Sequence, residues 1–449
     1  VGPMVDLMET RAGSGFTVVA AGDGTIWRDG MEQYERDMAA GESIGIPIAL
    51  IILVVVFGAV VAAGVPVILA FLGILVSVGM TAILSQVLDI DSITINIISM
   101  IGLAVGIDYT LFIVERFREE RVHGLAKVDA IVSAGATASR AVLFSGITVM
   151  IALAGLAIVP TAIMFSLAIG AITVVIAAVA LALTALPAVL SLFGDRINWL
   201  TLPGRKVKLQ TSDEVGFFGK TTHVVMAHPW LSAGLSTALL VALAIPYFRI
   251  NIGSTGISTF PEDLQSVQAF NILNEEFSAG RIDPAEVVIE GDVKSPEVAA
   301  SLERLRQLIA DDPNIAEMGE LVAAPDGRAG YVPILLNGDS TSPEAMSALR
   351  ELRKTYVPQA FDGSGVDVIV GGGTAGTVDY IDVMNQYLPI VIGFVLTLSF
   401  ILLLMVFRSI VIPIKAIIMN LLSVGAAYGL VVLVFQEGVI GFFIDRIGV

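Results

Sequence analysis

The chain has 449 residues, of which 55% are apolar and only 15% are charged. A typical soluble domain carries about 25% charged residues, so this composition excludes an ordinary soluble protein and indicates a membrane protein. The formal net charge of −17 argues against a nucleic-acid partner. Because the chain has no cysteine and only three histidines, the sequence predicts no disulfide, no metal site and no cofactor.

Apolar runs of about 18 or more residues predict membrane-spanning helices, because about 20 residues at 1.5 Å each cross the hydrocarbon core. A soluble core helix could imitate one such run, but eight in one chain favour a multi-pass α-helical membrane protein. The chain begins at Val1 without an initiator methionine and stops at Val449 soon after an apolar run, so we expect a fragment of a longer protein. The predicted spans cover residues 44–64, 66–88, 93–114, 141–160, 163–192, 229–248, 388–407 and 410–435.

The polar segments between these runs indicate the orientation and the domains. Arginine and lysine concentrate in the connections at 115–140 and 195–228, and positive residues mark the cytoplasmic side of a membrane. Counting spans from these connections places the two acidic segments outside. We therefore divide the chain into an outer segment (1–43), five spans (44–192), a cytoplasmic linker (193–228), a span that opens the second half (229–248), an outer domain (249–387) and the remaining spans (388–449).

Alternating elements predict an α+β fold for the outer domain. Helices are predicted after Ser295 and Ser342, because each serine is a favourable N-cap and is followed by proline at the first helical position. The resulting order βαββαβ is that of ferredoxin-like domains. The stretches typical of strands are AEVVIE (285–290), IAEMGELVA (315–323), GYVPILLN (330–337) and VDVIVGG (366–372).

The two ends of the chain resemble each other. FTVVAAGDGT ends at Thr25 and VDVIVGGGT ends at Thr374, and similar apolar stretches contain Phe57 and Phe407. Both pairs are separated by about 350 residues, and a nearly constant offset indicates an internal duplication. Parallel repeats of membrane helices are a transporter design in which the functional site lies between the halves.

The stretch GLAVGIDYTLFIVERFREE (102–120) places Asp108 and Tyr109 inside an apolar run, roughly 10 Å from the charged boundary at Glu115. A charged aspartate at this depth costs at least ~2.5 kcal/mol, and such residues usually face the bundle interior and serve ion or proton pathways. We therefore predict a proton relay at Asp108, with Tyr109 as a hydrogen-bonding partner that adds no charge. The alternative is a structural polar contact between two helices.

Other residues near this pair are weaker candidates. Gly102 and Gly106 have the spacing that permits close helix packing. Ser145 and Thr148 in the next span could donate to the carboxylate or hold water, although membrane serine and threonine often bond their own backbone. RFREER (116–121) is interpreted as a solvated inner boundary. GGGTAG (371–376) is interpreted as a linker from the outer domain to the membrane. No catalytic arrangement is visible, so an enzyme is not expected.

These stretches resemble the MMPL (mycobacterial membrane protein large) family of the resistance–nodulation–division (RND) superfamily. GIDYTLFIVERFREE is highly specific, and AVLFSGITVMIALAGL and FRSIVIPIKAIIMNLLSVGAAYG also match, so the resemblance covers the spans from about 44 to 435. It implies twelve spans and two outer porter domains. Asp108 and Tyr109 fall on the family's proton-relay pair, with Phe112 and Ser145 beside it. The family's second Asp-Tyr pair would fall beyond Val449, and the first span would precede Val1. Segment 1–43 would be the end of the first porter domain.

The leading hypothesis is therefore proton-driven export of lipids or other hydrophobic molecules across the bacterial cell membrane. The partners would be membrane lipids, the hydrophobic substrate and protons; assembly as a homo-oligomer is left open. The alternative is a lipid-sensing, sterol-sensing or Patched-like receptor with no required flux. A protein-export accessory of the SecD/SecF type is a third possibility, against which the Asp-Tyr stretch argues.

Overall fold

The computed structural model describes residues 18–20, 22–200, 217–250, 257, 260–276 and 283–439. Eight of its helices are long and apolar enough to cross a membrane, which confirms the prediction of a multi-pass helical protein. The chain divides into two compact units, and each is described by itself. One comprises Val1–Ser43 and Ile252–Asn385, and the other comprises Ile44–Asn251 and Gln386–Val449.

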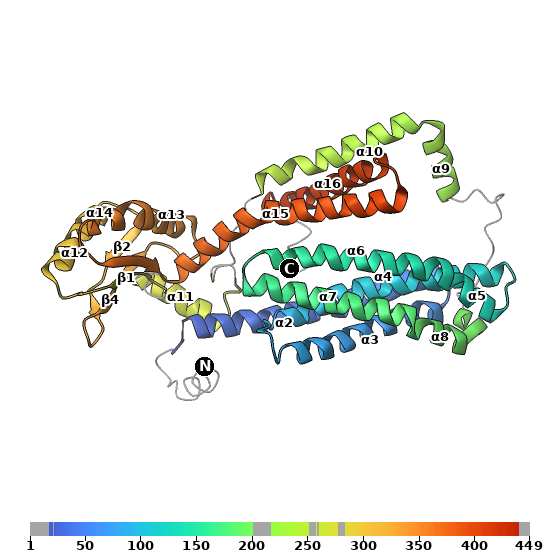
Figure 1. Cartoon of the computed structure of the whole chain (residues 1–449), viewed down its shortest axis with the longest axis horizontal. Helices are drawn as coiled ribbons and strands as arrows, with labels where there is room; N and C mark the ends of the chain where they lie inside the picture. Colours follow the sequence, from blue (N-terminus) through green and yellow to red (C-terminus); the bar gives the residue numbers. More distant parts are fainter. Residues whose placement is uncertain are drawn as a thin grey trace. The chain divides into compact units, whose positions relative to one another are not determined.

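Five candidate spans of the first half belong to one helical group, in which α3, α4 and α7 pack closely (Figure 1). The fourth span, Lys127–Ile158, contains a π-helical turn at Gly135–Ser139, and the fifth, Ala162–Phe193, contains two helices. The helices of this group are α2 (Asp23–Phe57), α3 (Val60–Leu84), α4 (Thr94–Val122), α5 (Lys127–Ala134), α6 (Arg140–Ala154), α7 (Ala162–Leu183) and α8 (Ala185–Phe193).

Small and hydroxyl side chains hold α3 to α7. The Ser77 hydroxyl lies 3.0 Å from the Thr173 hydroxyl, and the Thr81 hydroxyl lies 3.2 Å from it. All three residues are buried. Hydrogen bonds between helices and close backbone packing are the main attractions inside a bilayer, where apolar burial contributes little.

The first two spans have different boundaries from those predicted. The sequence prediction placed the break near Pro66, whereas α2 ends at Phe57 and Pro66 lies inside α3. The break comes from Gly58, whose φ of +67° is left-handed and ends the helix at low cost in the absence of a Cβ. At its other end α2 starts at Asp23, so its 35 residues extend about 50 Å, well beyond a hydrocarbon core of about 30 Å.

The second half repeats this helix–turn–helix geometry. Helix α15 also has 35 residues, ends at Phe407, and is followed by a left-handed residue, Arg408, with a φ of +50°. On α16, Gly425 and Gly429 pack against the C-terminal end of α10, where a Cβ on Gly425 would lie 3.2 Å from the Ala244 Cβ. The membrane helices of this half are α10 (Pro229–Ala244), α15 (Gly373–Phe407) and α16 (Val411–Val431), preceded by α9 (Phe217–Ala227).

The unit that comprises Val1–Ser43 and Ile252–Asn385 contains an antiparallel sheet with the strand order β2-β4-β1-β5, and β3 pairs with β4. The predicted N-caps are confirmed, because the Ser295 and Ser342 hydroxyls each accept a backbone N–H at 3.2 Å. The elements are α11 (Gln265–Glu276), β1 (Ala285–Glu290), α12 (Pro296–Ile309), β2 (Ile315–Met318), β3 (Val322–Ala323), β4 (Ala329–Leu336), α13 (Pro343–Glu351), α14 (Val357–Phe361) and β5 (Asp367–Gly371).

The predicted strand 315–323 is divided into β2 and β3. The register against β4 shifts between Ile315 and Glu317, and Gly319 leaves the ladder while donating its N–H to the Pro333 carbonyl at 2.8 Å. Pro333 has no backbone N–H, so it cannot donate the reciprocal hydrogen bond of an antiparallel pair. Regular strand pairing therefore stops at this point. One face of the sheet and the helices form a single core that includes Val287, Ile334, Leu305 and Leu349.

The glycine-rich stretch 371–373 forms the start of α15. Gly372 has a φ of +98°, and the Gly373 N–H donates to the Asp283 carboxylate at 2.9 Å. This carboxylate occupies the space that a Gly373 side chain would need. The acid caps the positive end of the helix, as expected for an N-terminal carboxylate. This stretch joins β5 to α15, which contains a candidate span, and the capped start of the helix lies within it.

Candidate functional site

Helix α4 places Asp108 and the two glycines on different faces. Gly106 packs on Ala70 of α3, where a Cβ would lie 2.8 Å from the Ala70 Cα, and Gly102 packs between Ile74 and Val174. Two residues further along an α-helix correspond to about 200°, so Asp108 points away from the Gly106 contact. Asp108 is exposed, and no hydrogen bond or ion pair joins its carboxylate to the described residues.

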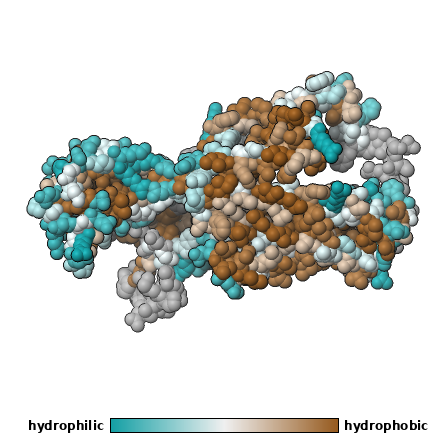
Figure 2. All heavy atoms as spheres, in the orientation of Figure 1, coloured by the Kyte–Doolittle hydropathy of each residue, from teal (hydrophilic) through white to brown (hydrophobic). Residues whose placement is uncertain are grey.

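The glycine face of α4 fills the interior of this helical group, because only glycine permits the close approach of α3 and α7. Asp108 therefore lies on the outward face of this helical group, whose surface is mainly apolar in Figure 2.

Tyr109 turns toward α6. Its side chain is half-buried and packs at the edge of the core of this group. A Cβ on Gly146 of α6 would lie 3.8 Å from the Tyr109 ring and would collide with Val179 of α7. The glycine thus lets α6 approach α7 closely while the tyrosine ring covers its edge. The structure therefore directs the adjacent Asp108 and Tyr109 to two different environments.

The remaining predicted residues also lie in different environments. Phe112 follows Asp108 by four residues, which places both on one helix face, and it is 51% exposed. Ser145 on α6 is also exposed. The Thr148 hydroxyl donates to the Phe144 carbonyl of its own helix at 2.8 Å, which is the alternative considered from the sequence. The Thr148 hydroxyl thus bonds its own helix, and supporting roles for Thr148 and Ser145 stay predictions.

The C-terminal end of α4 holds an ion cluster that joins it to α5. The Arg116 guanidinium pairs with Glu119 and Glu120, each at 2.6 Å. Glu120 is buried and accepts a hydrogen bond from the Ser133 hydroxyl of α5 at 2.9 Å. The interpretation of RFREER as a solvated boundary is therefore incomplete. The spacing of three and four residues between these charges was the available signal for the helical pairs.

Arg118 joins α4 to the end of α2. Its guanidinium donates to the Phe57 carbonyl at 2.8 Å and lies 5.4 Å from the centre of the Phe57 ring. The last carbonyls of a helix lack intrahelical donors, so this arginine satisfies one of them and complements the negative helix end. Nothing in the sequence signals this contact, because the two residues are 61 positions apart.

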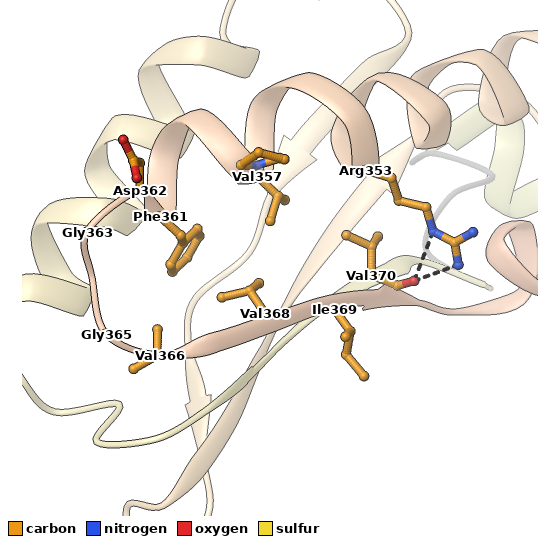
Figure 3. A pocket seen from close by; sticks show the side chains of 11 residues that line it. Arg353, Val357, Phe361, Asp362, Gly363, Gly365, Val366, Val368, Ile369 and Val370 are labelled. Carbon is orange, nitrogen blue, oxygen red and sulfur yellow. Dashed lines mark hydrogen bonds between the residues drawn. The ribbon is translucent and has the colours of Figure 1, made fainter.

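The unit that contains the β-sheet has a groove of about 600 Å³ between α14 and β5. Figure 3 shows Phe361 and Val368 pointing into the space between helix and strand, with Arg353 at one end and Asp362 at the other. Arg353 donates twice to the Val370 carbonyl, at 3.2 and 2.8 Å, and pairs with Asp379. Its donors are therefore engaged in binding the strand and α15. Among the described residues, no group of three acidic, histidine or cysteine side chains could hold a metal ion.

These features define a class: a multi-pass helical membrane protein with a carboxylate and a phenol adjacent on one span. The chain belongs to the MMPL family, whose model matches residues 4–229 and 258–442. The resemblance inferred from the sequence is thereby confirmed. Members of this family are transporters rather than enzymes, and the relatives are bacterial, so this is a multi-pass protein of a bacterial cell membrane.

Three relatives are similar over most of this chain. It is 33% identical to the mycolic acid-containing lipids exporter MmpL11 of Mycolicibacterium smegmatis, over 93% of this chain and 44% of that protein. It is 30% identical to the heme uptake protein MmpL11 of Mycobacterium tuberculosis, over 93% of this chain and 43% of the relative. It is 29% identical to the trehalose monomycolate exporter MmpL3 of the same species, over 90% and 46%. The chain thus spans less than half the length of these relatives.

Proposed function

We propose that this chain belongs to a proton-driven exporter of lipids or other hydrophobic molecules across the bacterial cell membrane. Two of the relatives are named as exporters of mycolic acid-containing lipids and of trehalose monomycolate, which supports a lipid substrate. The observation that carries the proton part is the exposed Asp108 on an apolar helix surface, where its carboxylate has no hydrogen-bond or ion-pair partner among the described residues. A free carboxylate facing hydrocarbon costs at least ~2.5 kcal/mol, so in the working protein this face meets protein or water.

The proposed cycle begins with proton binding at Asp108. Protonation removes the negative charge of the carboxylate. This changes how favourably the face of α4 that carries Asp108 packs against a neighbouring helix. The resemblance to the family suggests that this neighbour carries a second Asp-Tyr pair. Helix α4 cannot shift alone, because Arg118 binds it to the end of α2 and Glu120 binds it to α5. The movement would therefore pass into helices that continue toward the outer segments.

We further propose that residues 249–387 form a porter domain of the ferredoxin-like type and that segment 1–43 is the end of an equivalent domain. The antiparallel order β2-β4-β1-β5 and the two Ser-Pro helix starts support this assignment. In this proposal the membrane division follows the predicted boundaries, with spans at 44–192, 229–248 and 388–449. The outer domains would receive the hydrophobic substrate and release it outward.

The test is lipid transfer by the protein in proteoliposomes, with and without a pH gradient. The wild type is compared with Asp108→Asn and with Asp89→Asn, a control at an exposed aspartate outside the helices. We expect gradient-dependent transfer that Asp108→Asn abolishes and Asp89→Asn leaves unchanged. Transfer that ignores both the gradient and the Asp108 variant would refute the proposal and favour the sensing role. Because one relative is named as a heme uptake protein, heme is the competing cargo to assay in parallel.

A further inference from the structure

The outer end of α2 makes a contact with a distant helix. Asp29 is only 5% exposed, and its carboxylate accepts the backbone N–H of Ser266 at 3.2 Å. Ser266 is the second residue of α11, whose first N–H groups have no partner within the helix. Asp29 therefore caps a helix that lies 237 residues away in the chain.

The packing around this cap is close and partly apolar. Arg28 pairs with the second oxygen of the Asp29 carboxylate at 3.1 Å. Gly30 lies against the Phe260 ring, where a Cβ would be 2.9 Å from the Phe260 Cζ. The neighbouring apolar side chains form a separate small core. We call this set of contacts the α2–α11 joint; its apolar members are Ile26, Ile257, Phe260, Leu264, Val267 and Phe270.

Helix α2 is continuous between two such attachments. Its inner end, Phe57, accepts a hydrogen bond from Arg118 of α4, the helix that carries Asp108. Its outer part holds Asp29 in the joint, 28 residues earlier on the same helix. Both attachments belong to this one helix, which also contains Pro47 between them. The first-half helix α2 is thereby bound to α11, which precedes the β-sheet of the outer domain.

We propose that Asp29 is a positioning residue that couples the state of Asp108 to α11 through helix α2. The biological role of this coupling rests on the proposed function. The experiment that tests the coupling does not require transport. If the coupling exists, the protonation state at Asp108 changes the stability of the first turn of α11. If Asp29 merely packs, it stabilises α11 equally in both states.

The experiment is a double-mutant cycle read by amide hydrogen exchange at the start of α11 in the reconstituted protein. Asp108→Asn imitates the neutral, protonated form. We expect it to change the exchange rate of the Ser266 amide on the order of fivefold, within the usual range of coupling between sites. In the Asp29→Ala background, exchange should be faster overall and the effect of Asp108→Asn should disappear. Glu35→Ala, an exposed position on the same helix, should preserve the effect.

A covalent variant keeps the test decisive if Asp29→Ala folds poorly. The chain has no cysteine, so the pair Asp29→Cys and Ser266→Cys can be oxidised without competing thiols. The reduced pair should lack the coupling, and the disulfide should restore it. An Asp108→Asn effect that persists in Asp29→Ala or in the reduced pair, or that is absent from the wild-type background, overturns the proposal. Loss of gradient-driven transfer is measured separately and bears only on the proposed function.

Discussion

The Tyr109 ring on α4 lies 3.8 Å from the point where a Gly146 side chain would begin on α6. Gly146→Ala would place a methyl group against this ring and into Val179 of α7, so α6 must move away. We expect a loss of about 1–3 kcal/mol of stability, as in other overpacked cores. Thermal unfolding in detergent measures it. Gly135→Ala, in the same span but facing open space, is the control, and equal melting of the two variants would contradict this assignment.

Arg118→Lys tests the attachment of α4 to α2. Lysine keeps the charge but loses the planar group that stacks on Phe57 while it binds the Phe57 carbonyl. We expect a loss of about 1–2 kcal/mol, measured by thermal unfolding in detergent. Arg140→Lys is the matched control, because Arg140 lies 5.7 Å from the Phe144 ring within one helix. A larger loss from the Arg140 substitution would show that the Phe57 carbonyl contributes nothing.

The turns that follow α2 and α15 each contain one left-handed residue, Gly58 and Arg408. Substitution at these two positions is expected to change the melting temperature in opposite directions. Arg408 has a φ of +50°, where a side chain costs about 1–2 kcal/mol, and Gly58 holds the same conformation at +67° without this cost. Arg408→Gly is therefore expected to raise the melting temperature, and Gly58→Ala to lower it. Both variants are compared with the wild type in the same detergent. A lowered melting temperature for Arg408→Gly would mean that the arginine side chain contributes more than its backbone costs.

The Tyr356 hydroxyl predicts that the unit containing the β-sheet loses stability at high pH. Partial burial raises the pKa of its hydroxyl, and the hydrogen bond that it donates to Asp312 at 3.1 Å raises it further. A raised pKa stabilises the fold below the ordinary tyrosine value near 10, and this stability is lost as the pH rises through the folded-state pKa. The difference in phenolate absorbance between wild type and Tyr356→Phe gives the titration directly. Asp312→Asn should shift it downward; a midpoint at or below 10 in the wild type would refute the assignment.

The sequence alone predicted the features that depend on local composition. Eight apolar runs became eight candidate spans, because crossing a bilayer requires only length and low polarity. The N-caps at Ser295 and Ser342 were predictable for the same reason, since a cap involves residues three positions apart. The MMPL family was also recognisable, because the Asp-Tyr stretch is contiguous. The candidate residues Asp108 and Tyr109 could be named, but their surroundings could not.

The tertiary structure alone decided which faces and distant residues meet. Asp108 lies outward because α3 and α7 occupy the glycine face of α4, and no periodicity in α4 shows which face its neighbours will take. The joining of Arg118 to Phe57 and of Asp29 to Ser266 depends on helices separated by 61 and 237 residues. Such contacts arise from the packing of whole helices, in which side-chain shape and backbone approach determine the partners. A local pattern of hydropathy contains no information on side-chain shape or on how closely two backbones approach.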